Sequence, residues 1–243
     1  MIDIHCHILP GLDDGAGNMS DAIEMADLAA SSGIKSIIAT PHSNIPGGYR
    51  NYWSLSLEDD IKILQSEINN RNNPLTIYCG QEVFLASGFM ELLHKGNFIT
   101  LNRSRYILVE FDMLEQANVA YRKLEQLISE GYVPIVAHPE RYGFVWEQKE
   151  SVYRMKDLGA LLQVNKGSLK GRFGKNEMDV AIEIVETFQA DFIASDAHSQ
   201  YSRTPYLADV HEFISETYSS DYGDLLLKVN PQKVLNNETI YSF

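Results

Sequence analysis

Five of the seven histidines of this chain, and several carboxylates, stand at or just after the end of a short apolar run. The residues in such positions are His5, His7, His42, Glu82, Glu110, His138, Asp196 and His198. Parallel β-strands open their carboxyl ends on one face, so these side chains would converge there if the runs are parallel strands. Convergent imidazole and carboxylate groups are what a site for divalent metal ions requires.

The spacing of these residues supports the same interpretation. Side chains two positions apart on a strand share a face, so His5 and His7 can reach one centre while Cys6 points away. Asp196 and His198 have the same spacing. A single histidine pair would be weak support, because histidines serve many other roles. Two pairs and four more donors at equivalent strand ends are poorly explained by histidines that are satisfied one by one in polar loops.

The candidate ligands offer nitrogen and oxygen atoms only, which admits Mn²⁺, Fe²⁺ and Zn²⁺ alike. A carboxylate such as Glu82 can bridge two ions. Together with Asp14, Glu110 and Asp196 it contributes four negative charges. Three divalent ions would bring about six positive charges, and the surplus of about two suits a phosphate dianion.

Two arginines follow the candidate ligands closely. Arg141 stands three residues after His138, and Arg203 stands five residues after His198. Both would lie on loops at the same face, where a guanidinium group can bind phosphate oxygens through two hydrogen bonds. Either arginine taken alone could be an ordinary surface residue. Their shared placement beside ligand motifs favours catalytic residues that contact phosphate.

The elements that must position these residues alternate between strands and helices. Strand-like runs are expected at 2–5, 35–40, 75–79, 106–109, 133–137, 160–164 and 192–194. Helices are expected at 20–32, 57–70, 119–130 and 177–188, the first with Ser20 as its N-cap and Gly33 as its stop. This alternation implies parallel strands joined by right-handed crossovers. We therefore predict an α/β fold with a single domain over residues 1–243, a distorted, TIM-like, seven-stranded β/α barrel; an open doubly wound sheet is the alternative.

Composition narrows the classes of function. The net charge of −13 and the pI near 4.9 speak against a nucleic-acid partner, which usually needs a basic face. No run approaches eighteen uninterrupted apolar residues, so we expect no membrane insertion. Met1 leads straight into the first strand, without the pattern of a signal peptide. Two cysteines, Cys6 and Cys79, make no disulfide framework, and the protein is expected to be cytoplasmic and reduced.

The motifs taken together resemble the PHP (polymerase and histidinol phosphatase) superfamily. They are Ile-Asp-Ile-His-Cys-His at 2–7, Asp-Asp-Gly at 13–15, Ala-Thr-Pro-His at 39–42, Gly-Gln-Glu at 80–82, His-Pro-Glu-Arg at 138–141 and Ser-Asp-Ala-His at 195–198. Gly-Ser-Leu at 167–169, Gly-Arg-Phe-Gly at 171–174 and the stretch 230–240 extend the resemblance over essentially the whole chain. More narrowly, the chain is similar to the tyrosine-protein phosphatases of capsule and exopolysaccharide loci in Gram-positive bacteria.

This resemblance implies a site for up to three metal ions. The first ion would be held by His5, His7, Glu82 and Asp196, the second by Glu82, Glu110 and His138, and the third by Asp14, His42 and His198. Arg141 and Arg203 match the phosphate-contacting arginines of the family. Mn²⁺ is the expected metal, with Fe²⁺ or Zn²⁺ as alternatives, and a bacterial tyrosine autokinase is the expected partner. Ser43 stands where some relatives carry another histidine, which leaves the ligand set intact but could alter the rim of the pocket.

The expected function is hydrolysis of phosphotyrosine in a protein, by hydroxide that forms at a metal ion and attacks phosphorus in line. A phenolate leaving group, with a pKa of about 10, needs little help from a general acid. Two alternatives remain: a small-molecule phosphatase such as a histidinol-phosphate phosphatase, and a catalytically idle regulatory protein, which the complete ligand set disfavours. Cysteine-based catalysis is excluded, because Leu12 and Leu85 stand where it needs an arginine. The sequence leaves open whether the aromatic loop 43–54 covers the site.

Overall fold

The structure, a computed structural model, describes residues 1–241; Ser242 and Phe243, the end of the predicted domain, lie outside the described residues. Its strands are β1 (Ile2–Cys6), β2 (Ser36–Ala39), β3 (His42–Ser43), β4 (Thr76–Cys79), β5 (Glu82–Phe84), β6 (Tyr106–Glu110), β7 (Val133–Ala137), β8 (Leu161–Asn165) and β9 (Phe192–Ala194). All seven predicted strands are present, and β3 and β5 are short additions that follow β2 and β4.

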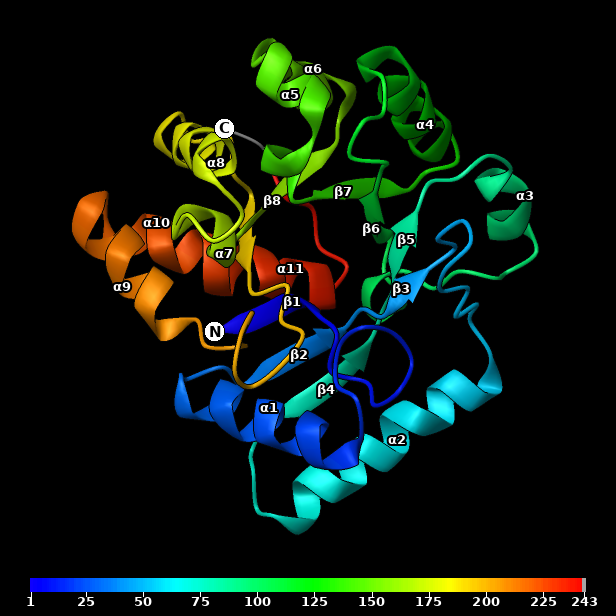
Figure 1. Cartoon of the computed structure of the whole chain (residues 1–243), viewed down its shortest axis with the longest axis vertical. Helices are drawn as coiled ribbons and strands as arrows, with labels where there is room; N and C mark the ends of the chain where they lie inside the picture. Colours follow the sequence, from blue (N-terminus) through cyan, green and yellow to red (C-terminus); the bar gives the residue numbers. More distant parts are fainter. Residues whose placement is uncertain (242–243) are drawn as a thin grey trace.

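The helices surround the strands (Figure 1). Four of them correspond to the predicted ones: α1 (Met19–Ser31), α2 (Leu55–Asn70), α4 (Ala117–Ser129) and α8 (Lys175–Glu186). The remaining helices of the described chain are α3 (Phe89–His94), α5 (Gly143–Glu147), α6 (Glu150–Leu158), α7 (Lys166–Leu169), α9 (Ala208–Thr217), α10 (Ser220–Asp224) and α11 (Asn230–Leu235). Two 3₁₀ turns, η1 (Leu101–Arg103) and η2 (Pro139–Arg141), and a π-helical turn, η3 (Leu225–Val229), complete the list. Within residues 1–241, none of these helices is long and apolar enough to cross a lipid bilayer.

The boundaries of α1, α2, α4 and α8 differ from the predicted ones by at most two residues, and the N-cap of α1 differs as well. The N-cap of α1 is Asn18, and Ser20 lies inside the first turn. The Asn18 side chain accepts a hydrogen bond from the backbone N–H of Asp21, which satisfies one of the free donors at the helix start. The predicted stop at Gly33 is confirmed, since this residue has a φ of 83° just after the helix ends.

The paired strands run parallel and form two sheets, β1-β2-β4 and β3-β5-β6-β7-β8-β9. The two sheets meet at two interrupted strands. One consists of β2 in the first sheet and β3 in the second, and the other consists of β4 in the first sheet and β5 in the second. The two sheets also meet at their edge strands β1 and β9. The amide of His7 donates to the carbonyl of Ala197, and the amide of Asp196 donates to the carbonyl of His5, both at 2.9 Å. These bonds join β1 to the end of β9. Seven strand positions thus form a ring, which confirms the distorted β/α barrel over the open sheet.

Side chains along the strands alternate between two apolar layers. Ile37 and Ala39 of β2 pack outward against the helices, whereas Ile38 between them points into the barrel. The inner cluster contains Ile2, Ile4, Ile38, Leu101, Tyr106, Leu108, Ile135, Ala137, Leu161, Phe192, Ala194 and Val234. Burial on both faces explains why the strands are nearly continuous apolar runs in the sequence.

Strand β1 contains one extra residue relative to β2. Asp3 pairs with Ile37, but Cys6 pairs with Ala39, so a β-bulge lies between Asp3 and Cys6. Cys6 is fully buried in the outer layer, away from the barrel mouth, as predicted.

Helix α11 closes the end of the barrel at which the strands begin. Its Val234 packs in the inner cluster with Tyr106 and Phe192, the first residues of β6 and β9. The Tyr106 hydroxyl donates to the carbonyl of Glu238 at 2.5 Å, which ties the segment after α11 to the same end. The opposite end, where the strands finish, carries the polar side chains.

Candidate metal centre

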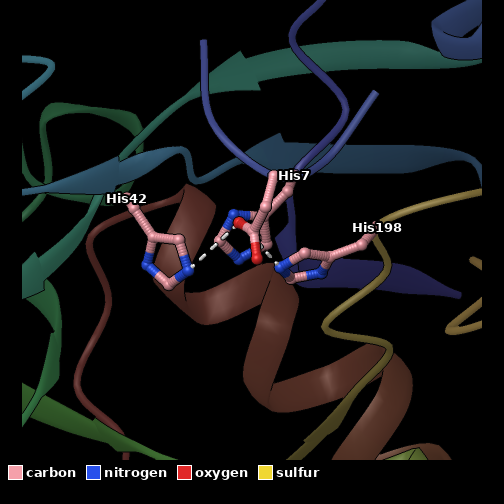
Figure 2. Close-up of side chains that lie close together, drawn as sticks. His7, His42 and His198 are labelled. Atoms are coloured by element: carbon pink, nitrogen blue, oxygen red, sulfur yellow. Dashed lines mark ion pairs between the residues drawn. The ribbon is translucent and has the colours of Figure 1, made fainter. Parts of the chain in front are cut away.

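The nine predicted ligands gather at the end of the barrel where the strands finish. They lie in or directly after β1 (His5, His7), β6 (Glu110), β7 (His138) and β9 (Asp196, His198), at the start of β3 (His42) and β5 (Glu82), and in the loop after β1 (Asp14). Three groups within this set bring ligand atoms within 4.8 Å of one another. Figure 2 shows the rings of His7, His42 and His198 turned toward a common centre.

The most deeply buried group consists of His5, His7, Glu82 and Asp196, each at most 2% exposed. The Nε2 atoms of His5 and His7 are 3.2 Å apart. Oε2 of Glu82 lies 3.3 Å from Nε2 of His5 and 3.4 Å from that of His7. Oδ1 of Asp196 lies 3.4 Å from both nitrogens. Two nitrogens and two carboxylate oxygens therefore face one centre.

A chain of hydrogen bonds determines which nitrogen of His5 carries a proton. Asp196 accepts from Nδ2 of Asn165 at 2.6 Å, which leaves Oδ1 of Asn165 to accept from Nε2 of Gln163 at 2.8 Å. Oε1 of Gln163 then accepts from Nδ1 of His5 at 2.7 Å. The proton of a neutral His5 is therefore on Nδ1, and the Nε2 lone pair points at the centre of the group.

His7 is oriented in the same way by Asp13. Nδ1 of His7 donates to Oδ2 of Asp13 at 2.8 Å, and the same oxygen accepts from the backbone N–H of His42. Burial lowers the pKa of His7, but Asp13 and the other carboxylates around the ring outweigh burial and raise this pKa well above its usual value. Two imidazole nitrogens and two carboxylate oxygens therefore face one centre that a cation must occupy, either a proton or a metal ion. Oε2 of Glu82 and Nε2 of His198 are also buried, and within residues 1–241 their polar neighbours do not meet hydrogen-bond geometry. This donor set fits divalent metal ions.

The second group joins His42, Glu82 and Glu110 and extends to His138. Nδ1 of His42 lies 2.9 Å from Oε2 of Glu82 and 3.0 Å from Oε1 of Glu110. Nε2 of His138 lies 2.9 Å from Oε1 of Glu82 and 3.8 Å from Oε2 of Glu110. Glu82 thus contacts histidines of the first and the second group, as a carboxylate that bridges two ions would.

The third group consists of Asp14, His42 and His198. Oδ1 of Asp14 lies 3.5 Å from Nε2 of His42 and 3.4 Å from Nε2 of His198, the kind of ion pair that the dashed lines of Figure 2 mark. The structure adds His7 to this group, because its ring centre is 3.9 Å from that of His198. The resemblance implies His7 for the first ion only, whereas the structure places it between the first and third groups.

The pKa values in the site reflect how closely its charges are packed. Burial lowers the pKa of His42, but Glu82 and Glu110 outweigh burial and raise this pKa to about 10. Burial, and then the charge of Glu82, raise the pKa of Glu110 to about 7. Burial lowers the pKa of His138 to about 4. His138 is therefore neutral near pH 7, the form in which a histidine binds metal ions, whereas His42 must release its proton before it can bind one.

Arg141 and Arg203 lie on the rim of the site, with 25% and 22% of their side chains exposed. Nη2 of Arg203 is 2.5 Å from Oδ2 of Asp196, and Nη1 of Arg141 is 3.9 Å from the same oxygen. The ring of Phe173 lies under both guanidinium groups, at 4.8 Å from Arg141 and 5.7 Å from Arg203. One carboxylate and one aromatic ring thus hold two cations side by side, where both can contact a phosphate group.

Three residues of the site have a left-handed backbone. The φ angles are 37° at His138, 48° at Asp196 and 34° at Arg203. Such angles are rare in residues other than glycine and cost about 1–3 kcal/mol each. The surrounding barrel maintains this strain at the positions where the side chains point into the site.

The sequence analysis assigned no role to Asp13, Gln163 and Asn165, which orient the ligands, or to Phe173, which packs under the two arginines. Gln163 and Asn165 are fully buried in the otherwise apolar strand β8, and this interruption of an apolar run was the available signal. Asp13 stands beside Asp14, but nothing local indicates that it binds His7. Phe173 had no signal of its own, because aromatic residues are common in every core.

The three aromatic residues of loop 43–54 take two different positions. The ring of Tyr49 lies parallel to that of His42 with centres 6.1 Å apart, and 37% of Tyr49 is exposed. Tyr52 packs edge-on against Phe98, and Trp53 packs against the outer core. Tyr49 therefore borders the site, while the other two aromatic residues anchor the loop.

Comparison with known proteins gives the family. The family described as "Capsular polysaccharide synthesis, CpsB/CapC" matches residues 1–236. The chain belongs to the CpsB/CapC family. Tyrosine-protein phosphatase YwqE of Bacillus subtilis (strain 168) is 36% identical over 241 residues, which cover 99% of this chain and 94% of the relative. Tyrosine-protein phosphatase CpsB of Streptococcus agalactiae is 28% identical over 250 residues, which cover 99% of this chain and 100% of the relative.

Solved structures extend the comparison of this CpsB/CapC chain to its fold. One comes from a study of YwqE from Bacillus subtilis and CpsB from Streptococcus pneumoniae, described as unique metal-dependent tyrosine phosphatases. It matches with a TM-score of 0.92 and 35% identity over 100% of this chain and 97% of the other. A mutant of the organophosphorus hydrolase from Deinococcus radiodurans matches with a TM-score of 0.60 and 13% identity, over 96% and 92%. The second likeness shows the fold alone.

Proposed function

We propose that this chain is a metal-dependent protein-tyrosine phosphatase. The observation that carries the proposal is the buried group in which two imidazole nitrogens and two carboxylate oxygens face one centre. Arg141 and Arg203 adjoin this group through Asp196. A cation site beside two arginines is suited to bind a phosphate dianion and to stabilise charge on its oxygens. The names of the relatives YwqE and CpsB support the substrate class.

We propose Mn²⁺ as the metal, in up to three sites. His5, His7, Glu82 and Asp196 would hold the first ion, Glu82, Glu110 and His138 the second, and Asp14, His42 and His198 the third. The distances within each set support this assignment, and His7 is close enough to contribute to the third site. The same nitrogen and oxygen donors also accept Fe²⁺ or Zn²⁺. Bound divalent ions would lower the pKa of water and neutralise phosphate charge.

Arg141 and Arg203 would bind the phosphate group from the rim. Each guanidinium group can donate two hydrogen bonds to phosphate oxygens, and Phe173 keeps both groups in place. A phenolate, with a pKa of about 10, departs without full protonation, so a strong general acid is not required. Phosphotyrosine also has the necessary reach, whereas a phosphoserine would have to bring its backbone down to the first group, whose four ligands are almost fully buried.

We further propose that the substrate protein is a tyrosine autokinase and that the enzyme works in the cytoplasm. The family description concerns capsular polysaccharide synthesis, the setting in which the resemblance implies such a kinase. Cys6 and Cys79 are free thiols, as expected in a reducing compartment.

A direct test compares three substrates with added Mn²⁺: a phosphotyrosyl peptide, the same peptide with phosphoserine, and histidinol phosphate. We expect the highest kcat/KM for the phosphotyrosyl peptide. A higher value for histidinol phosphate would make the chain a small-molecule phosphatase. Failure to turn over any of them with metal bound would favour a regulatory binding protein.

Variants of the rim test the role of the two arginines. Arg141→Ala and Arg203→Ala should each lower kcat/KM for the phosphotyrosyl peptide about ten- to a hundredfold, because charge-assisted hydrogen bonds to phosphate are lost. Bound metal, measured by elemental analysis, should not change. Arg122→Ala, on the exposed surface of α4, serves as the control and should leave both quantities unchanged. A loss of metal in the rim variants would mean that the arginines act through Asp196.

A further inference from the structure

A cavity of about 410 Å³ adjoins the metal centre on the side of Arg203. Its walls include Lys166, Lys170, Arg172, Phe173, Arg203 and Asp209. Ser195, the neighbour of Asp196, also lines it. Arg203 and Phe173 thus belong both to the rim of the site and to the cavity. A substrate segment whose phosphate is bound at the rim would therefore run beside the cavity.

We propose that this cavity is a subsite for an acidic side chain, Asp or Glu, next to the phosphotyrosine in the substrate protein. The proposal rests on the proposed phosphatase function. It also gives a role to the Gly-Arg-Phe-Gly motif at 171–174, of which the metal centre uses Phe173 alone.

The charge of the cavity is opposite to that of the chain as a whole. The chain has 33 acidic and 20 basic residues, a net charge of −13. The cavity wall instead carries four cationic side chains and one carboxylate, that of Asp209, which is paired with Lys170. Arg203 is likewise paired with a carboxylate, so Lys166 and Arg172 are the two cations of the wall without a carboxylate at ion-pair distance within residues 1–241. A local positive field in an acidic protein attracts an anionic group.

Lys166 contributes a positive charge whose position is held by hydrogen bonds. Its side chain is 6% exposed, and Nζ donates to the carbonyls of Thr204 and Tyr206 at 2.8 and 2.7 Å. These carbonyls belong to the segment after β9 that carries Arg203. Neutral oxygens satisfy the ammonium group, and no carboxylate within residues 1–241 lies at ion-pair distance from it, although Asp209 and Asp3 are close enough to favour its charged form.

Arg172 is the cation that can adjust to a ligand. It is exposed, and within the described residues no carboxylate lies at ion-pair distance from it. Gly167 lies beside it, where a Cβ would be too close to the ring of Phe173, at 2.9 Å, and in ordinary contact with Cδ of Arg172, at 3.5 Å. The absence of a side chain at Gly167 lets Phe173 pack closely at the wall of the cavity.

Matched peptides test the subsite. Three phosphotyrosyl peptides that differ only in Glu, Gln or Lys at the positions flanking the phosphotyrosine are hydrolysed by the Mn²⁺-loaded enzyme. We expect kcat/KM for the Glu peptide to exceed that for the Gln peptide about three- to tenfold, with the Lys peptide lowest. Arg172→Glu should reverse this order. The ratios come from one enzyme preparation, so partial misfolding cannot produce a reversal.

Two further variants sharpen the test. Arg122→Glu, on α4, changes the net charge by the same amount and should keep the preference for Glu. Asp209→Asn removes the carboxylate of the wall and should increase that preference. Equal rates for the three peptides, an unchanged order in Arg172→Glu, or a reversal in Arg122→Glu would each overturn the subsite while leaving the phosphatase function intact. No hydrolysis of any phosphotyrosyl peptide would overturn both.

Discussion

The two ends of the barrel are built on opposite principles. At the end where the strands begin, Tyr106 and Phe192 pack with Val234 of α11 in a closed apolar cluster. At the end where they finish, His5 and Asp196 are buried just as deeply. Apolar side chains gain free energy by leaving water, whereas imidazoles and carboxylates lose their hydration and need partners. Equal burial therefore stabilises one end and makes the other dependent on cations.

The backbone is strained at both ends, in different kinds of residue. At the polar end, His138, Asp196 and Arg203 of the site itself have positive φ, whereas at the packed end positive φ occurs in the turn residues Asn102, Arg103 and Asn237 and in no residue of the inner apolar cluster. Strain of this kind persists only where the surrounding structure determines the conformation. The packed end thus supplies the stability that the polar end requires, and the following changes test this division.

The largest effect is expected from removing a ligand at the polar end. Asp196→Ala removes one oxygen of the first group and the partner of Arg203. We expect kcat/KM to fall at least about a hundredfold, because partners that merely orient ligands are already worth about 10–100-fold. Metal content should fall, and the circular dichroism spectrum should not change.

Asp59→Ala, an exposed carboxylate on α2, is the control for this variant. Extensive chelation of the parent protein should abolish activity, and Mn²⁺ should restore it best. Full activity in the metal-free protein would contradict the metal centre.

Replacing a large apolar side chain by a small one at the packed end should lower stability and leave catalysis intact. Leu161 is 3% exposed at the start of β8, inside the inner cluster. Leu161→Ala should lower the free energy of unfolding by about 2–5 kcal/mol, measured by urea denaturation with metal present. Leu114→Ala, at a position 85% exposed, should stay within about 0.5 kcal/mol of the parent. Loss of metal from folded Leu161→Ala would show that the two ends are not independent.

A smaller effect is expected from changing a residue that orients a ligand without being one. Asp13→Asn keeps the shape of the side chain but replaces one of two acceptor oxygens, which serve His7, His42 and Gly15. Metal affinity, measured by competition with a chelator, should fall about 10–100-fold because His7 loses its orientation. Asp59→Asn is the matched control. An unchanged affinity would mean that Asp13 does not orient His7 for metal binding and only stabilises the backbone around Gly15 and His42.

The smallest effect on activity is expected at Cys6. Burial raises the pKa of its thiol well above the usual value, so it stays protonated and cannot act as a nucleophile. Cys6→Ser should retain most activity, and thiol-alkylating reagents should act only through added bulk. Complete loss of turnover in Cys6→Ser with metal still bound would point to covalent catalysis by this cysteine.

The sequence by itself determined the barrel class and the residues that meet at its mouth. An apolar run followed by a histidine or a carboxylate is a local feature, and parallel topology brings all such positions to one end. Two of the helices after β9, α10 and α11, escaped prediction for a related reason. Helices as short as α10 and α11 span too few turns to show a helical period in their apolar residues.

The tertiary structure alone decided how those residues are used. The bond from His5 to Gln163 joins positions 158 residues apart, and it determines which nitrogen of His5 faces the centre. The position of His7 between two groups, and that of Phe173 under Arg141 and Arg203, likewise depend on which strands and loops become neighbours in the ring. Local patterns cannot specify such contacts, because closing the barrel is what brings these distant segments together.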